Sequence, residues 1–218
     1  MTLPADLKAK VLASVQATPA PKRAPWWQVV LWIVPMSIAV AFSLFTAMGG
    51  MQHGQGRPTW MLVGTFLGWL TVAVLGTWGA FGRGRSAVGR ARAVLAAIAL
   101  ATPVVLFAST LLWNAVYPEA AHWWEGRLGL KCLGLSLGMA VWPLVGMILV
   151  RKQSNPVHPG MTGAALGAAS GAWAGVVVDL WCPVSHPAHI ALGHILPIVL
   201  LAIAGLVIGR RVMAIGGK

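Results

Sequence analysis

From about residue 29 to its end, the chain alternates between long apolar stretches and short polar segments. Each stretch has about 20 residues, the length of α-helix that crosses a hydrocarbon core about 30 Å thick. Proline occurs inside several stretches, as membrane helices tolerate when neighbouring groups satisfy the freed carbonyls. The pattern therefore predicts an all-α, polytopic membrane protein, a six-helix transmembrane bundle. Its expected spans are residues 29–48, 61–81, 93–116, 130–150, 161–180 and 190–212.

The composition agrees with this pattern. The chain of 218 residues is 58% hydrophobic and only 9% charged, whereas soluble domains contain about 25% charged residues. So few ionic groups could not cover the surface of a soluble protein of this size. The first 25 residues lack the order of segments typical of a cleaved signal peptide, so we expect the first span to remain as an anchor.

The net charge of +12 is explained by the expected topology, because Lys and Arg concentrate in cytoplasmic loops. With the N-terminus inside, only Arg57, Arg127 and Lys131 of the 16 basic residues fall in outer loops. We therefore expect both termini in the cytoplasm. The basic residues are divided among short segments without interleaved aromatic residues, so we expect no direct contact with nucleic acid.

The fifth stretch carries Gly163, Gly167, Gly171 and Gly175, each four residues apart and so on one helix face. Small residues on such a face allow another helix to approach closely. The pattern favours tight packing within one chain, and a homodimer through this face is the alternative.

The segment before the first span has a different character. The sequence MTLPADLKAKVLASVQAT predicts a short amphipathic helix, which is marginal alone in water. We expect it to bind a groove on a partner protein, with contact to membrane lipid or a frayed tail as alternatives. We therefore divide the chain into a cytoplasmic partner-binding segment and linker, residues 1–25, and a transmembrane domain, residues 26–218. The expected partner-binding residues are Leu3, Asp6, Leu7, Val11 and Val15.

Thiol and imidazole groups gather on the outer side of the predicted membrane. The segment DLWCPVSHPAHIALGH, residues 179–194, holds Cys182, and the other cysteine, Cys132, opens the fourth stretch. Both thiols therefore lie at outer helix ends, where a disulfide between them is permitted. Alternatively they are soft ligands for a transition-metal ion, with imidazoles completing its shell. The candidate imidazoles are His122, His186, His189 and His194.

His194 lies about one turn inside the sixth stretch, where an ionisable group is costly and marks a candidate functional site. Asp179, one turn before the loop, is its expected polar partner. A structural hydrogen bond between the two helices is the alternative interpretation of this pair.

Several motifs follow Cys132 in a defined order. Pro143 lies in the fourth stretch, and the basic pair at 151–152 ends it. A Gly- and Ala-rich fifth stretch follows, then Cys182-Pro183 and a His-bearing last stretch that ends in GRR at 209–211. This order resembles the NrsF family of six-span bacterial anti-sigma factors. In size and layout the chain is also similar, more loosely, to CarR-type membrane anti-sigma factors of light-induced carotenoid synthesis.

The resemblance implies a regulator rather than an enzyme. It implies that the short N-terminus holds an extracytoplasmic-function sigma factor at the bacterial cytoplasmic (inner) membrane. It also implies that the outer-side cysteines, here Cys132 and Cys182, sense metal or oxidative stress. A transition-metal ion would then act as a signal rather than as a resident cofactor.

Two other classes remain as alternatives. A membrane thiol oxidoreductase usually needs a reactive CxxC-type pair in addition to a resolving pair, and this chain has 2 cysteines. A small-molecule or metal transporter usually carries polar or broken-helix sites near the membrane midplane. Asp179 is the one acid within the predicted spans, and it lies near one end.

Overall fold

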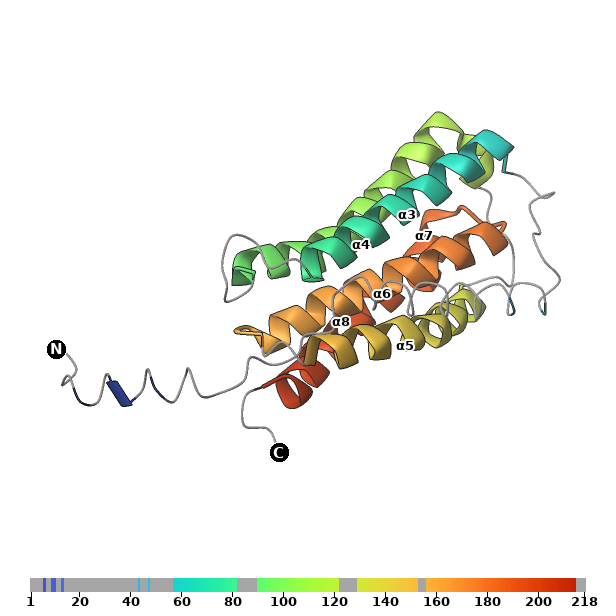
Figure 1. The fold of residues 1–218 in the computed structure, drawn as a ribbon. Coiled ribbons are helices and arrows are strands. Elements are labelled where there is room, and N and C mark those ends of the chain that lie inside the picture. The colour runs from blue at the N-terminus through green and yellow to red at the C-terminus, as the bar shows by residue number, and fades with distance from the viewer. Residues whose placement is uncertain are drawn as a thin grey trace.

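The computed structural model describes residues 57–81, 90–121, 129–152 and 156–214, together with positions 6, 9, 10, 13, 43 and 47. Within these residues the regular elements are helices, as Figure 1 shows. The long helices are α3 (Thr59–Phe81), α4 (Arg92–Val116), α5 (Leu130–Lys152), α6 (Pro159–Trp181) and α8 (Leu196–Val212). The short helices are η1 (Pro118–Ala121), α7 (Pro187–Ile190) and η2 (Ala191–Ile195).

Five segments of the described chain are long and apolar enough to cross a membrane. Four are the helices α3, α4, α5 and α6, and the fifth joins α7, η2 and α8 from Pro187 to Val212. The chain is therefore a multi-pass helical membrane protein, and these segments match five of the six predicted spans to within a few residues. The predicted first span, 29–48, lies outside the described residues except for Ser43 and Ala47, which are helical and exposed.

Helix α6 is the centre of the bundle. Its apolar stretch is 83% buried, against 28–39% for the other four spans. In Figure 1, α3 and α4 lie on one side of α6, and α5 and α8 lie on the other. Helix α6 is built largely from Gly, Ala and Ser, and these small side chains allow the other helices to pack closely around it. The other helices cover α6 and turn their larger apolar side chains outward.

The glycine face of α6 packs within the chain. A Cβ at Gly163 would overlap the carbonyl of Gly205, and a Cβ at Gly167 would overlap the carbonyl of Leu201, both on α8. The α6 and α8 backbones are therefore in direct contact, as small residues permit in membranes. Gly171 and Gly175 meet Ile198 of α8 and the Trp69 ring of α3, respectively. The predicted packing within one chain is thus observed, and this face is not open to a second copy.

The last span contains one turn of π-helix, η2. Pro197 has no N–H to donate to the carbonyl of Gly193, four residues before it. The N–H of Leu196 instead bonds to the carbonyl of Ala191. The Gly193 carbonyl accepts a hydrogen bond from Ser136 Oγ of α5 at 3.2 Å. Single π turns are frequent at functional sites, and this one carries His194.

Candidate metal and thiol site

Two cysteines and two histidines meet at one end of the bundle. Cys132 lies in the first turn of α5, and Cys182 directly follows α6. His189 lies in α7 and His194 in the π turn. One ligand atom from each residue lies within 4.8 Å of all the others, and all four residues are buried. We call these residues the four-residue cluster.

Two glycines allow the start of α5 to approach the π turn. Gly129, just before α5, has a φ of 86°, which a residue with a Cβ rarely adopts. A Cβ there would also lie 2.9 Å from the carbonyl oxygen of His189. On the opposite side, a Cβ at Gly193 would lie 2.9 Å from the Cβ of Cys132. These positions bring the Cys132 thiol against the segment that carries both histidines.

The polar atoms of the cluster form a short chain of contacts. Cys132 Sγ donates to Cys182 Sγ at 3.6 Å, and Cys182 Sγ lies 3.1 Å from Nε2 of His189. The rings of His189 and His194 are 5.7 Å apart between centroids. The Cys132 thiol and burial raise the pKa of the Cys182 thiol above its ordinary value, against an opposite effect of the two histidines.

The cluster has the donor set of a thiophilic metal site. Two thiolates and two imidazoles suit Zn²⁺ and related ions. In a tetrahedral site with Zn–S bonds of about 2.3 Å the two sulfurs lie about 3.8 Å apart, close to the 3.6 Å between these sulfurs. Neither ring nitrogen of His194 has a hydrogen-bond partner among the described residues. Because buried polar atoms normally have partners, these residues fit a bound metal ion.

The structure separates the four candidate histidines. His189 and His194 belong to the cluster. Nδ1 of His186 accepts a hydrogen bond from the N–H of Ala188 at 3.3 Å, so His186 caps α7 instead. His122 lies outside the described residues.

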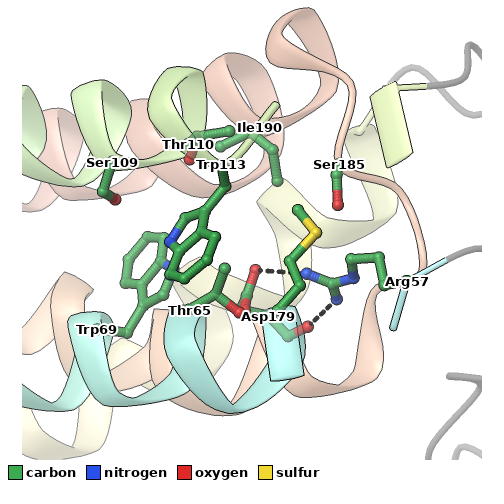
Figure 2. A pocket seen from close by; sticks show the side chains of 10 residues that line it. Arg57, Thr65, Trp69, Ser109, Thr110, Trp113, Asp179, Ser185 and Ile190 are labelled. Atoms are coloured by element: carbon green, nitrogen blue, oxygen red, sulfur yellow. Dashed lines mark hydrogen bonds and ion pairs between the residues drawn. The ribbon is translucent and has the colours of Figure 1, made fainter. Parts of the chain in front are cut away.

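Asp179 pairs with Arg57 rather than with His194, its predicted partner. Arg57 Nη1 donates to Asp179 Oδ1 at 3.3 Å, and both side chains are buried. Nη2 donates to the backbone carbonyl of Asp179 at 2.5 Å and to the carbonyl of Cys182. Figure 2 shows the guanidinium group reaching Asp179. A guanidinium forms charge-assisted hydrogen bonds with a carboxylate, which favours Arg57 as the partner of Asp179.

A small pocket adjoins this ion pair (Figure 2). Hydroxyl groups of Thr65, Ser109 and Thr110 contribute to its lining. Asp179 Oδ2 and Arg57 Nε are buried without hydrogen-bond partners among the described residues. The pocket has room for about one water molecule, which could bond to such atoms.

Sequence reasoning missed Arg57, Ser136 and Asn114. The amide of Asn114 on α4 donates to the carbonyl of Ser185 at 2.8 Å and holds the loop after Cys182. One signal for Arg57 was present, because an acid such as Asp179 at membrane depth needs a cation, and few basic residues lie on the predicted outer side.

The described N-terminal positions agree with the predicted short helix. Asp6, Ala9, Lys10 and Ala13 are helical and exposed. The apolar residues expected to bind a partner lie outside the described residues. These are Leu3, Leu7, Val11 and Val15.

The fold and the site define a multi-pass helical membrane protein with a buried cysteine and histidine cluster at one end of its bundle. The model of the NrsF family, described as negative regulator of sigma F, matches residues 12–214, and the chain belongs to this family. The resemblance found in the sequence is thereby confirmed. The family is a class of regulators of a sigma factor rather than a class of enzymes. Searches of curated proteins and of solved structures find no match to this chain.

Proposed function

We propose that the protein is a membrane-bound anti-sigma factor with a thiol-based sensor. It holds an extracytoplasmic-function sigma factor through residues 1–25 and releases it when Cys132 and Cys182 react with an oxidant or a thiophilic metal ion. Family membership supports the negative regulation of a sigma factor. The observation that carries the sensor role is the gathering of four ligand atoms within 4.8 Å of one another.

The positions of basic residues support an inner-membrane topology with the sensor outside. Helix α5 begins near Cys132 and ends in Arg151 and Lys152, so the thiol and the basic pair lie at opposite ends. Helix α8 likewise ends in Arg210 and Arg211, one span away from the histidines. Because basic residues mark the cytoplasmic side, the cluster would face the periplasm of the bacterium.

Two chemical events at the cluster could serve as the signal. In oxidation, the two thiols lose two electrons and two protons to a two-electron oxidant such as a peroxide, and an S–S bond forms. The sulfurs would move from 3.6 Å to about 2.05 Å. In metal binding, both thiols lose their protons and the four residues supply the ligands. A disulfide would draw α5 toward the loop after α6, and a metal ion would tie the two together at about their present separation.

The energy of these events is adequate for release. Moving a sigma factor from nearly all bound to nearly all free needs about 5.5 kcal/mol of differential affinity. Structural zinc sites supply about 10–16 kcal/mol in small peptides. Release therefore needs only a fraction of the metal-binding free energy to weaken the binding of the sigma factor on the cytoplasmic side.

The test is a reporter of sigma-dependent transcription in cells that express the full chain with its cognate sigma factor. We expect Cd²⁺ or diamide to raise reporter activity in the wild type, and we expect Cys132→Ser and Cys182→Ser to keep it low. His186→Ala is the matched control, because this histidine lies outside the cluster. Wild-type induction in both serine variants would contradict the sensor role of the thiols.

A further inference from the structure

Arg57 completes the end of α6. The last carbonyls of a helix have no partner within the helix, and in a membrane each needs another donor. Arg57 supplies it, because one nitrogen of its guanidinium donates to the carbonyls of both Asp179 and Cys182. A cation at a helix C-terminus also interacts favourably with the helix dipole. The other terminal nitrogen pairs with the Asp179 carboxylate at 3.3 Å, so the buried charge of Arg57 is balanced.

This contact reaches the backbone of a sensor residue. The carbonyl that accepts from Arg57 belongs to Cys182, whose Sγ contacts both Cys132 and His189. The same loop is held from α4, where Asn114 donates to Ser185 at 2.8 Å. Cys182 is thus placed by side chains that come from outside α6.

We propose that Arg57 is a positioning residue that sets the place of the Cys182 thiol and connects the four-residue cluster to the N-terminal part of the chain. The proposal rests on the sensor role proposed above. A reaction that moves Cys182 shifts its carbonyl, and the guanidinium follows because it is bonded to that carbonyl. Arg57 lies two residues before α3, which begins at Thr59.

The sequence position of Arg57 places it between the proposed sigma-binding segment and the helices that carry the thiol site. The predicted first span, 29–48, ends nine positions before Arg57, and the proposed sigma-binding segment, 1–25, precedes that span. Arg57 therefore joins the backbone of a thiol residue to the part of the chain that leads to the partner, beside the contact of the Trp69 ring of α3 with the ring of His194.

Arginine is required by this arrangement. Three acceptors surround one guanidinium, and its planar fork serves them together, whereas lysine presents a compact charge without that geometry. Arg57→Lys keeps a cation opposite Asp179 but loses the fork. Arg57→Gln removes the charge as well. Arg92→Gln is the matched control, because Arg92 is exposed at the start of α4.

The first measurement concerns position alone. In membranes that contain the full chain with Cys132→Ser, the rate of Cys182 alkylation by a maleimide is compared with and without the Arg57 substitutions. We expect Arg57→Gln and Arg57→Lys to accelerate alkylation at least tenfold and Arg92→Gln to leave it unchanged. Equal rates in all four proteins overturn the positioning role, whatever the function of the thiols.

The second measurement uses the sigma-dependent reporter with both cysteines present. We expect both Arg57 variants to hold the sigma factor without inducer, which also reports that they fold, and to need at least tenfold more Cd²⁺ for half-maximal induction. An Arg57→Lys protein that accumulates and responds at the wild-type Cd²⁺ concentration overturns the connection. If the cysteine variants lose induction in the same assay while the Arg57 variants keep it, only this inference fails. If the cysteine variants keep it, the sensor proposal itself fails.

Discussion

The backbones of Gly163 and Gly205 are in contact, so that a Cβ on either glycine would overlap the carbonyl of the other. This contact joins α6 to α8 over most of their length, with Gly167 and Gly209 extending it. Packing of this kind depends on the absence of side chains. Substitution of these glycines would therefore force the α6 and α8 backbones apart.

We expect Gly205→Leu to prevent α8 from packing on α6 and to abolish accumulation of folded protein in membranes. Gly205→Ala should cost about 1–3 kcal/mol, since one added methyl group forces the backbones apart. Thermal unfolding in detergent measures the difference. Gly134→Ala on α5 is the control, because a Cβ there meets nothing within 4 Å. Equal melting of the two alanine variants would contradict the assigned packing.

Ser136→Ala should destabilise the π turn. Its hydroxyl is the partner of the Gly193 carbonyl at 3.2 Å, and an unsatisfied buried carbonyl costs about 1–3 kcal/mol. Ser109→Ala is a matched change, because among the described residues that hydroxyl bonds to the carbonyl of Leu106 in its own helix. Unfolding curves should shift for the first variant and not for the second. A larger shift for Ser109→Ala would be inconsistent with this assignment.

The full chain in detergent should bind one Co²⁺ with the visible absorption of tetrahedral thiolate coordination. We expect His194→Ala and His189→Ala to weaken binding at least tenfold, since each removes a ligand of the four-residue cluster. His186→Ala should bind as the wild type does, because this ring caps α7. Titration followed by absorbance separates the two results, and equal affinities in all variants would exclude the proposed ligand set.

A mild oxidant should join Cys132 to Cys182 within one chain. The sulfurs are 3.6 Å apart and buried together, so the intramolecular reaction has a strong advantage over cross-linking between chains. Mass spectrometry should show the loss of two hydrogens and no free thiol, and non-reducing gels should show monomer. A disulfide-linked dimer as the main product would refute the proximity of the two thiols.

At the N-terminus, Leu7→Asp and Val11→Asp should release the sigma factor without any inducer. A charge on the apolar face of the predicted helix would remove its contact with a partner groove. Lys10→Gln serves as the comparison, because Lys10 is helical and exposed. The reporter and co-purification of the sigma factor both measure the outcome. Retention of the sigma factor by both aspartate variants would assign the binding to another segment.

The spans and the pairing of thiols with imidazoles were predictable from the sequence. An apolar run of span length is a local property, and it placed α3, α4, α5 and α6 to within a few residues. The alternation of inside and outside then put Cys132 and Cys182 at the same membrane face. The two thiols come within 3.6 Å of each other because they lie at the same depth and because α5 and α6, which carry them, are neighbours in the bundle.

The choice of partners inside the site was not predictable in the same way. It depends on how α3 packs against α6, and the apolar pattern leaves the rotation of each helix open. His194 was therefore the expected partner of Asp179, being close to it in sequence. The observed partner, Arg57, lies 122 positions away along the chain. The π turn was not predicted either, because the carbonyl of Gly193, which Pro197 cannot serve, is bonded by the hydroxyl of Ser136 on another helix.

The thiol site is shared between two parts of the bundle, the connection between the closely packed helices α6 and α8 and the start of α5. Cys182, His189 and His194 lie on the connection between these two helices and so move with them. Cys132 alone comes from α5. A disulfide or a shared metal ion is therefore a crosslink across a joint, and it can restrict the angle at which α5 meets the rest of the bundle without deforming any single helix.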